Sequence, residues 1–504
     1  MQYVLKAKEM KYCDQKTIEK IGIPSLVLME RAALVTIEEI ERIQKIKGNI
    51  LVAAGTGNNG GDGLAIGRML VEKGAKVTFL LVGSREKVSE ETNAQIRIVE
   101  NLGFSIQSKI ENEEYDMIVD ALFGIGLGRA VEGKYCELIE AMNRMKQKGT
   151  FICSVDIPSG ICADTGKVMG CAVKADLTVS YAYAKRGHLL YPGKEYTGIL
   201  KVRDIGIPKK IFGESTSSAF YYEKEDLKGA LAMRRPDGNK GTFGKVLLLA
   251  GSHDMCGACL VCGESVMRTG AGMVKIISPE CNREIIQKAL PEAMLQSYTD
   301  EPDEASLSKS IAWADVLVAG PGVGTGEIAL KVLTFCLKNS KIPIVLDADA
   351  LNLISEEEAL QELVKTREEG MTVMTPHPGE LVRLLQTDME KYRNDREELV
   401  EALIEKYNCV VAAKDAVTLV AEGKQREICI NISGNDGMAT AGSGDVLAGI
   451  IGGLLAQKMN AFDAASFGVF LHGLAGDTAS EKKGKHSVMA TDIVKALPEV
   501  IYHL

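Results

Sequence analysis

The feature that most constrains this chain is a repeated order of short apolar run, glycine-rich loop and helix. In the first half, the apolar run Asn49–Ala54 precedes the glycine-rich residues 55–63, a helix predicted over 64–73 and a second apolar run, Lys76–Val82. Short apolar runs that alternate with helices are typical of parallel strands buried on both faces. The pattern therefore predicts an α/β fold, in which helices cover both faces of a parallel sheet.

More runs of the same kind follow along the chain. Apolar residues at helical spacing also predict one helix over Thr17–Lys45. The other strand-like runs are Asp116–Asp120, Phe151–Asp156, Asp176–Tyr181, Ile199–Val202, Lys245–Ala250, Met273–Ile277, Ala314–Ala319, Pro343–Leu346, Thr372–Thr375, Val410–Ala413, Val417–Val420 and Ile428–Ile430.

The rhythm is interrupted once, between about Ile211 and Asn239. A Ser/Thr patch (GESTSS), a charged stretch and the segment RRPDGN replace it there. Because a single core rarely grows past ~250–300 residues, a chain of 504 residues predicts two domains. We place them at residues 1–220 and 226–504, with a boundary near 213–235.

Composition argues against two classes of partner. The formal net charge is −9 and no run of Lys and Arg is longer than a pair, so neither a nucleic-acid footprint nor a basic membrane anchor is expected. The longest apolar stretch, Val446–Ala456, is too short to span a membrane. The first residues carry charges where a secretory signal is apolar, so we expect a cytoplasmic protein.

In the cytoplasm the 12 cysteines are expected to be thiols. Three of them, Cys256, Cys259 and Cys262, recur every third residue in a segment that is predicted to begin a helix. They are interpreted as small buried apolar side chains, with a metal site as the less favoured alternative because a fourth ligand at matching spacing is missing.

Three strand ends in the first half carry polar groups that suit a ligand. The loop GTGNNGGDG at 55–63 lies between a strand and a helix, where free amides and the helix dipole favour phosphate. Its spacing fits neither a P-loop nor a dinucleotide fingerprint. Asp120 and Asp156 end two further strands, and loops with glycine follow both. Because ligands of open α/β sheets bind at the carboxyl ends of strands, a hard cation or a polar ligand is expected there. A ligand-free turn and simple helix caps are the alternatives.

Together these segments resemble a known family. LMERAA at 28–33, GTGNNGGDG, VDALFGIGLGR and VDIPSG are similar to the YjeF N-terminal family of NAD(P)HX epimerases. The resemblance implies a Rossmann-like αβα domain that interconverts the R and S forms of hydrated NADH and NADPH (NADHX and NADPHX). It implies potassium held by Asn59, Asp120 and Ser159. The substrate contacts that it implies are Asn58, Asn59, Gly60, Gly61 and Asp62, and, along the phosphates, Gly124, Ile125, Gly126, Leu127, Gly128, Arg129 and Ala130.

The epimerase reaction inverts the hydroxyl-bearing carbon of the substrate ring. An aspartate that exchanges protons would serve this reaction. The resemblance places Asp156 near the reacting ring, so Asp156 is the favoured acid/base and Asp120 the ion ligand; the sequence leaves open which of the two has which role.

In the second half the strongest signal is Gly442-Ser-Gly-Asp445, directly before the small-residue helix 446–456. Glycine amides at a helix start form an anion hole, and a carboxylate beside them can take a proton while phosphate is transferred. Asp445 is therefore the candidate base, with an N-cap role as the alternative.

The order of the surrounding motifs carries a second resemblance. KGTFGK at 240–245, GPGVG at 320–324, DADALN at 347–352, TPHPGE at 375–380 and Lys414-Asp415 are similar to the ribokinase-like superfamily, and within it to ADP-dependent NAD(P)HX dehydratases, over residues 230–504. The resemblance implies a ribokinase-like αβα domain. The adenine-nucleotide contacts that it implies are Lys414, Asp415, Ala416, Val417, Thr418 and Gly444, and the hydrate contacts are Ala258, Gly322, Gly324, His377 and Asp445.

Two of these positions have competing interpretations. The family often has Lys-Gly where this chain has Lys414-Asp415, and the added acid would lie close to a polyphosphate. A lone histidine such as His377 is more often a plain loop residue. Phosphoryl transfer implies Mg²⁺, although the sequence shows no dedicated ligand spacing.

The leading hypothesis is a bifunctional repair enzyme for hydrated nicotinamide cofactors, an epimerase joined to a dehydratase. It would use ADP, with ATP as the alternative, and a homo-oligomer is expected. A second hypothesis makes the C-terminal half a small-molecule kinase that releases a stable phosphorylated product. A third makes the N-terminal half a non-catalytic binding module.

Overall fold

The computed structural model describes residues 1–503 except 111–113, 213–218, 232–233, 300–301 and 424–426. The chain forms two compact units, Gln2–Ala219 and Phe220–Leu504. The GESTSS patch falls largely in 213–218, outside the described residues, as does part of the expected boundary at 213–235. No helix of the described part is long and apolar enough to cross a membrane.

The N-terminal unit is built on a parallel sheet with the strand order β4-β3-β2-β5-β6-β7-β9. Its strands are β1 (Gln2–Leu5), β2 (Asn49–Ala54), β3 (Lys76–Leu81), β4 (Ile106–Gln107), β5 (Met117–Ala121), β6 (Phe151–Val155), β7 (Leu177–Tyr181), β8 (Ala184–Lys185) and β9 (Ile199–Arg203). Its helices are α1 (Ala7–Lys16), α2 (Ser25–Ile43), α3 (Asn58–Glu72), α4 (Glu90–Asn101), α5 (Lys134–Gln147), α6 (Arg186–Leu189), α7 (Gly193–Thr197) and α8 (Lys209–Phe212).

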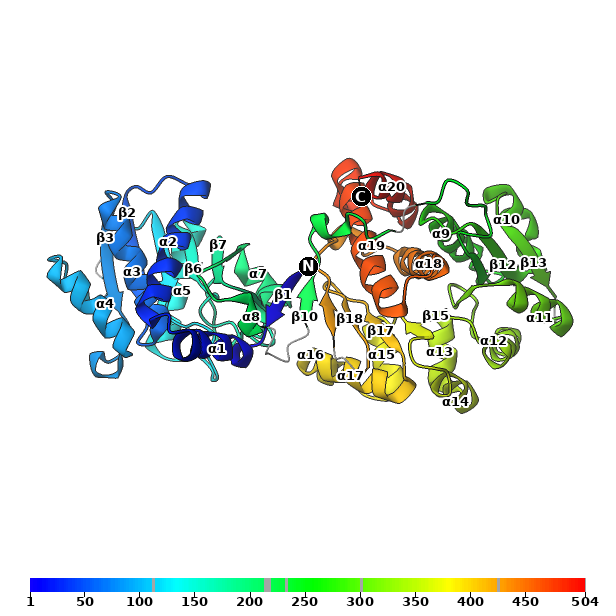
Figure 1. The fold of residues 1–504 in the computed structure, drawn as a ribbon, viewed down its shortest axis with the longest axis horizontal. Coiled ribbons are helices and arrows are strands. Elements are labelled where there is room, and N and C mark those ends of the chain that lie inside the picture. Colours follow the sequence, from blue (N-terminus) through cyan, green and yellow to red (C-terminus); the bar gives the residue numbers. More distant parts are fainter. Residues whose placement is uncertain (111–113, 213–218, 232–233, 300–301, 424–426, 504) are drawn as a thin grey trace. The chain divides into compact units, whose positions relative to one another are not determined.

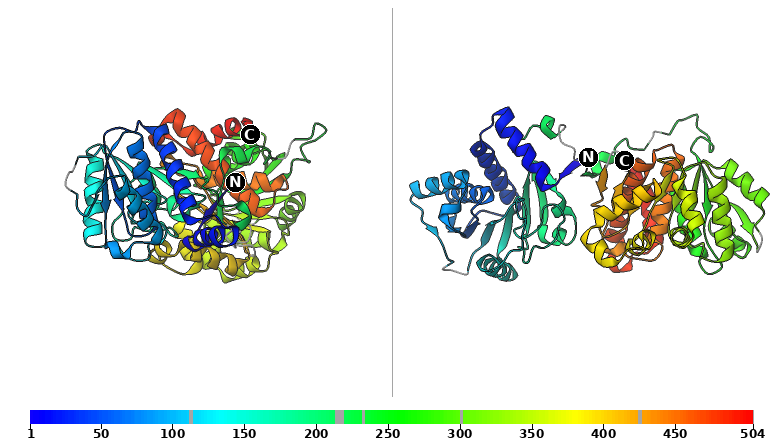
Figure 2. Two further views of the ribbon diagram at one scale, coloured as in Figure 1. Left: turned by 60° about the vertical axis from the view of Figure 1, so that its left-hand side comes forward. Right: turned by 90° about the horizontal axis from the view of Figure 1, so that it is seen from below.

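Alternation along β2 explains why this sheet is covered on both faces. Ile50, Val52 and Ala54 pack into a core with residues of α1 to α4, whereas Leu51 and Ala53 pack into a second core with α5. Successive side chains of a strand point to opposite faces. Figures 1 and 2 show the blue helices and the teal helix α5 on opposite faces of the sheet. The predicted three-layer α/β fold is confirmed.

The C-terminal unit repeats this architecture around a second sheet, with the order β13-β12-β11-β14-β15-β16-β17-β18-β19. The strands are parallel up to β17, and β18 and β19 are antiparallel. They are β11 (Lys245–Leu249), β12 (Met273–Pro279), β13 (Met294–Tyr298), β14 (Val316–Ala319), β15 (Ile344–Leu346), β16 (Thr372–Met374), β17 (Val410–Ala413), β18 (Leu419–Ala421) and β19 (Ile428–Ile430), while β10 (Ala219–Tyr221) lies where the two units join in sequence.

Most of the core on this sheet is contributed by helices α9, α18, α19 and α20, with Ile286 of α10 joining it. The helices of the unit are α9 (Cys256–Arg268), α10 (Arg283–Ala289), α11 (Glu304–Trp313), α12 (Glu327–Asn339), α13 (Asp349–Glu356), α14 (Glu358–Lys365), α15 (Pro378–Leu385), α16 (Met389–Asn394), α17 (Arg396–Tyr407), α18 (Ser443–Ala456), α19 (Ala461–Lys483) and α20 (Ala490–Tyr502).

Two helix predictions were wrong in their bounds. The helix expected over Thr17–Lys45 is divided, because Gly22 adopts φ 86° and Pro24 follows it, so that α2 starts only at Ser25. The helix expected from Leu64 starts six residues earlier, at Asn58. The glycines of this segment therefore belong to the helix itself, where a Cβ at Gly63 would collide with Ala121 and one at Gly67 would crowd Phe79.

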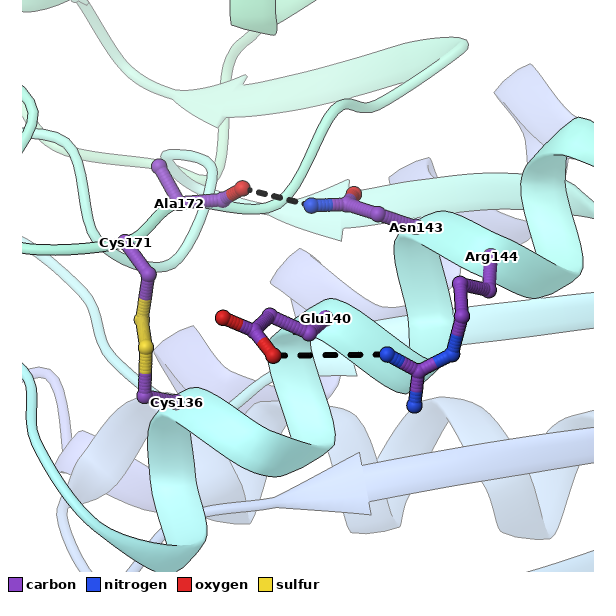
Figure 3. Close-up of a disulfide and its surroundings, with 6 residues drawn as sticks. All are labelled: Cys136, Glu140, Asn143, Arg144, Cys171 and Ala172. Atoms are coloured by element: carbon purple, nitrogen blue, oxygen red, sulfur yellow. Dashed lines mark hydrogen bonds and ion pairs between the residues drawn. A yellow bond between two sulfur atoms is a disulfide. The ribbon is translucent and has the colours of Figure 1, made fainter.

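One expectation about the cysteines also needs correction. Cys136 of α5 and Cys171, in the segment before β7, are joined by a disulfide, and the other ten cysteines are free (Figure 3). The Cα atoms of Cys136 and Cys171 lie 5.9 Å apart, within the usual range for a disulfide. Next to this bond, the Asn143 side-chain amide of α5 donates a hydrogen bond of 2.9 Å to the carbonyl of Ala172 (Figure 3). The sequence offered no signal for this pairing, since it depends on where α5 packs.

We predict that Gly449→Ala lowers the free energy of unfolding of the C-terminal unit. Gly449 lies in α18, and a Cβ there would collide with the backbone carbonyl of Cys262 in α9. Overpacking of this kind costs about 1–3 kcal/mol. Urea denaturation measures the change.

The matched control is Gly257→Ala in α9. A Cβ at Gly257 meets nothing within 4 Å, so the helix propensity of alanine should make this variant neutral or more stable by up to about 1 kcal/mol. Equal effects of the two substitutions on stability would contradict the close packing of α18 on α9.

Two candidate active sites

The N-terminal unit has a cavity of about 560 Å³ at the carboxyl ends of its central strands. Residues of α1, α2 and the first turns of α3 form part of its wall, and the loops that follow β2, β5 and β6 contribute further residues, together with Lys185 of β8. Predicted site residues that line the cavity are Asn58, Asn59, Asp62, Gly124, Ile125, Gly126, Leu127, Gly128, Arg129 and Asp156. The position of this cavity agrees with the rule that open parallel sheets bind ligands at the carboxyl ends of their strands.

Glycines at the start of α3 allow that helix to pack closely against the loop after β2 and against α2. A Cβ at Gly60 would collide with the carbonyl of Gly55, and one at Gly61 would lie 2.6 Å from the Cε of Met29. Gly60 and Gly61 are both buried. The polar side chains of the same turn, Asn59 and Asp62 among them, are the ones that line the cavity.

Asp120 and Ser159 form a buried oxygen-rich cluster with Ser154. The Asp120 Oδ2 accepts hydrogen bonds from the Ser154 hydroxyl at 2.7 Å and from the Ser159 amide at 2.9 Å, and the Ser159 hydroxyl accepts one from the Phe123 amide. Burial raises the pKa of Asp120, and its hydrogen bonds from Ser159 oppose that rise. The Asn59 Nδ2 is buried without a partner among the described residues.

The structure adds a residue that sequence reasoning missed, Lys185 of β8. Its side chain is fully buried and its Nζ binds the Asp156 Oδ1, the Ser180 hydroxyl at 2.9 Å and the Tyr181 carbonyl at 3.2 Å. Asp156 itself adopts φ 63°, in the left-handed region that non-glycine residues seldom occupy. The backbone is thus held in a costly conformation that turns this carboxylate toward Lys185 and the cavity.

His188 contacts the backbone of both Asp156 and Lys185. Its Nε2 lies 2.8 Å from the Asp156 carbonyl, and the Lys185 amide donates to its Nδ1 at 3.0 Å. Burial, helped by the neighbouring Lys185 charge, lowers the pKa of His188 to about 3. The imidazole is therefore neutral at pH 7, and the charge at this corner comes from Asp156 and Lys185.

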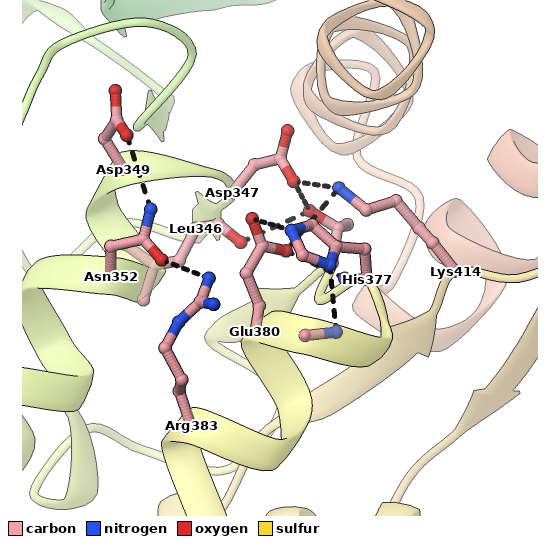
Figure 4. Close-up of polar contacts among 10 residues, drawn as sticks. Leu346, Asp347, Asp349, Asn352, His377, Glu380, Arg383 and Lys414 are labelled. Carbon is pink, nitrogen blue, oxygen red and sulfur yellow. Dashed lines mark hydrogen bonds and ion pairs between the residues drawn. The ribbon is translucent and has the colours of Figure 1, made fainter. Parts of the chain in front are cut away.

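In the C-terminal unit, Lys414, which follows β17, lies close to Asp347, His377 and Glu380 (Figure 4). Lys414 Nζ pairs with the Asp347 Oδ1 and lies 4.0 Å from the Glu380 Oε2. Asp347 follows β15 and also accepts a hydrogen bond of 2.7 Å from the Thr375 hydroxyl. The Asp347 Oδ2 is buried and has no hydrogen-bond partner among the described residues.

Asp445 lies at the start of α18, next to this pair. A Cβ at Gly444 would be 3.2 Å from Lys414 Nζ and 3.8 Å from the Asp347 Oδ2, which puts the first turn of α18 directly over the ion pair. Burial, together with the Asp347 charge, raises the pKa of Asp445 to about 7, and the Lys414 charge opposes that rise. Asp445 can therefore take and return a proton near neutral pH.

His377 is more than a loop residue. It is the N-cap of α15, where its Nδ1 accepts from the Gly379 amide at 3.0 Å while Glu380 accepts from the His377 amide at 2.7 Å (Figure 4). Its Nε2 lies 3.2 Å from the Glu380 Oε1. Burial and the Lys414 charge lower the pKa of His377. Half of its side chain is exposed, so a ligand can reach it.

The remaining predicted hydrate contacts also converge on this edge of the sheet. Gly322 adopts φ 61°, and a Cβ there would lie 2.8 Å from the Cβ of Ala258, which places the 320–324 loop against the first turn of α9. The Gly324 amide donates to the Asp349 Oδ2 at 2.9 Å. Ala258 and Gly322 are thus neighbours although they are far apart in the sequence.

Asp415 turns away from this centre. Its Oδ2 accepts from the Tyr392 hydroxyl at 2.8 Å and lies 3.5 Å from Nη1 of Arg396. Arg396 therefore offsets the extra acid beside the predicted nucleotide contacts. The residues after it, Ala416, Val417 and Thr418, continue directly into β18, which starts at Leu419.

The Cys256, Cys259 and Cys262 series is a packing feature. Cys259 and Cys262 are fully buried in the core of α9, and burial raises their thiol pKa values. Within the described part of the chain, no group of three or more His, Cys, Asp or Glu residues could hold a metal ion. The burial of Cys259 and Cys262 agrees with their interpretation as small buried apolar side chains, whereas Cys256 is only partly buried.

We predict that Lys185→Met lowers the free energy of unfolding of the N-terminal unit by about 3–5 kcal/mol, because it leaves the Asp156 charge buried without its partner. The double variant Lys185→Met/Asp156→Asn should recover most of that loss. Chemical denaturation of the wild type, the two single variants and the double variant gives the coupling free energy between the two side chains. A double variant as unstable as Lys185→Met would contradict the ion pair as the cause.

Comparison with known proteins agrees with both halves of this description. The sequence-family model described as YjeF-related protein N-terminus matches residues 25–187. The family model described as NAD(P)H-hydrate dehydratase matches residues 246–499. The bifunctional NAD(P)H-hydrate repair enzyme Nnr of Moorella thermoacetica is 35% identical, over 100% of this chain and 97% of its own length. The enzyme of the same name from Escherichia coli is 33% identical, over 98% of this chain and 93% of its own.

A solved structure of a ribokinase-like superfamily protein from Enterococcus faecalis matches with a TM-score of 0.51 and 29% identity, over 57% of this chain and 96% of its own. This match confirms the ribokinase-like fold that the second resemblance implied. The full-length similarity shows that the chain belongs to the family of bifunctional NAD(P)H-hydrate repair enzymes.

Proposed function

We propose that residues 1–220 epimerise the R and S forms of NADHX and NADPHX and that residues 226–504 dehydrate the S form with ADP. As a member of its family, the chain repairs hydrated NADH and NADPH, and the small-molecule kinase is not favoured. The observation that carries the division of labour is the pair of separate polar centres, one around Asp156 and Lys185 and one around Asp445 and Lys414.

In the dehydratase, Asp445 takes the proton from the hydroxyl of the hydrate while a phosphoryl group passes from ADP to that oxygen, which leaves AMP. The phosphate then departs with the former hydroxyl oxygen, a proton leaves the adjacent ring carbon, and the double bond of the reduced nicotinamide is restored. Lys414 offsets the growing negative charge, and the free amides at the start of α18 bind the phosphate.

Mg²⁺ belongs to this proposal as the ion that offsets the charge of the nucleotide phosphates. Lys414 to Thr418 and Gly444 would bind the adenine nucleotide, and Ala258, Gly322, Gly324 and His377 the hydrate. The preference for ADP over ATP, the cytoplasmic location and a homo-oligomeric state stay predictions.

In the epimerase, Asp156 is the proposed acid/base, and Asn59, Asp120 and Ser159 would hold potassium. The residues offer carboxylate, hydroxyl and amide oxygens, the ligand type that suits a hard cation. A bound cation would offset nearby substrate phosphate charge. The loop from Gly124 to Ala130 would bind those phosphates, and Asn58 to Asp62 the rest of the substrate.

We predict that the purified protein restores the absorbance of reduced nicotinamide from S-NADHX when ADP is added, and that Asp445→Asn abolishes this recovery. In the wild type, kcat/KM should fall about tenfold per pH unit below a pKa near 7, because a carboxyl with a raised pKa is protonated and inactive as a base there.

Asp436→Asn is the matched control for this experiment, since Asp436 is an exposed acid in the nearby loop that pairs with Lys485. It should leave the recovery unchanged. No recovery by the wild type with either ADP or ATP would contradict the dehydratase assignment, and full activity of Asp445→Asn would remove that residue from the mechanism.

We predict that consumption of R-NADHX requires potassium and is lost in Asp156→Asn. The rate of R consumption, corrected for spontaneous epimerisation, is measured in potassium and in lithium buffers at equal ionic strength. Asp120→Asn should raise the potassium concentration needed for half the maximal rate, because it removes the charge that would hold the ion. An equal rate in both buffers would contradict a potassium site.

A further inference from the structure

A third carboxylate enters the N-terminal cavity from a helix that the catalytic proposal does not use. Asp14 lies in the last turn of α1, and its half-buried side chain lines the same cavity as Asp156, Lys185 and Asp62. Lys185 is already committed to Asp156, Ser180 and the Tyr181 carbonyl. The Asp14 carboxylate has neither a hydrogen bond nor an ion pair among the described residues, so the protein supplies no partner for it.

A partly desolvated carboxylate without a partner is costly, and it is unusual away from a functional site. Other acids of the same helical segment are satisfied: Glu9 accepts from the Lys6 amide, and Glu19 accepts from Gln15. Asp14 differs from them because it faces the cavity. Its position is therefore explained by a ligand rather than by the stability of α1.

The chemistry of the cavity calls for a second proton-exchanging group. When inversion proceeds by loss and re-addition of water, an oxygen leaves one face of the ring carbon and an oxygen is added to the other. One group must give a proton to the departing hydroxyl, and another must take a proton from the incoming water. Asp156 and Asp14 come to the cavity from different elements, the end of β6 and the helix α1.

We propose that Asp14 is the second catalytic acid/base of the epimerase, which exchanges a proton with the substrate on the ring face away from Asp156. This inference rests on the proposed epimerase function of the N-terminal unit. The substrate ring then lies between α1 and the strand end that carries Asp156.

The protonated Asp14 gives its proton to the hydroxyl oxygen; the carbon–oxygen bond breaks, its electron pair leaves with the oxygen as water, and the lone pair of the ring nitrogen forms a carbon–nitrogen double bond. A solvent water adds to the opposite face, that electron pair returns to nitrogen, and the surplus proton passes to the Asp156 carboxylate. Solvent returns the proton to Asp14, and the reverse reaction exchanges the two roles.

The charges around Asp14 suit this role. Burial raises the pKa of Asp14 to about 7, the nearby Asp156 charge adds to that rise, and the Lys185 charge opposes it. Both protonation states are therefore populated at neutral pH. Asp62 also lines the cavity, and burial, together with the Asp156 and Asp14 charges, raises its pKa well above the ordinary value.

The test compares Asp14→Asn with the wild type in the intact chain. Consumption of R-NADHX should fall by roughly 100-fold or more in kcat with little change in KM, because general acid–base catalysis contributes 10²–10⁴-fold. ADP-dependent dehydration of S-NADHX by the same polypeptide should be unchanged, which shows that the protein is folded and correctly quantified. Glu19→Gln, which removes an exposed acid from the neighbouring turn, should behave as the wild type.

Two further measurements separate catalysis from a role in shape. Asp14→Glu keeps the carboxyl and should recover part of the rate, whereas equal losses in Asp14→Asn and Asp14→Glu, with raised KM, would overturn the proposal. In water enriched in heavy oxygen, each enzymatic inversion should place one solvent oxygen on the product, as measured by mass spectrometry. Retention of the original oxygen would overturn the proposal as well.

The outcomes also separate this inference from the epimerase assignment. A wild type that does not consume R-NADHX above the spontaneous rate overturns both. A wild type that does, together with an Asp14→Asn variant within threefold of its rate, overturns only the role of Asp14.

Discussion

Both candidate sites depend on a helix whose first turns lie closer to the protein core than a side chain would allow. At α3, a Cβ on Gly60 would collide with the carbonyl of Gly55; at α18, a Cβ on Gly449 would collide with the carbonyl of Cys262. Glycine is the residue that permits such an approach. The close packing brings the polar residues of each helix start, Asn59 and Asp445, to the ends of the strands where the ligand-binding groups gather.

The sequence predicted the strands better than the side-chain partners, and the reason is physical. A buried parallel strand is readable as a local apolar run, and Asp120 and Asp156 are placed by the strands that they end. Lys185 gives no such signal, because it belongs to the two-residue strand β8, which exists only through its pairing with β1. In the sequence, Asp14 is likewise only one of several polar residues of a helix, and its place at the cavity becomes visible only in the folded structure.

Helix bounds failed where local chemistry competed with periodicity. Apolar spacing continued across Gly22 and Pro24, although these residues end one helical segment before α2 begins. The Cys136–Cys171 disulfide could not be predicted either, since the two residues are separated by 35 positions and meet only when α5 packs on the sheet. The extra acid Asp415 looked unfavourable beside a phosphate until the fold supplied Arg396 and Tyr392 as its partners.

The two sites share an electrostatic arrangement although their sheets differ. In each, a lysine is bonded to one aspartate, Lys185 to Asp156 and Lys414 to Asp347, and a second aspartate nearby has no bond to its carboxylate among the described residues. Because the lysine is paired with its own aspartate, its charge stabilises the second carboxylate only weakly. Burial therefore raises the pKa of the second aspartate, Asp14 or Asp445, to about 7. A carboxyl in that range can both give and accept a proton at neutral pH, and proton exchange with a hydroxyl is the step that epimerisation and phosphoryl transfer have in common.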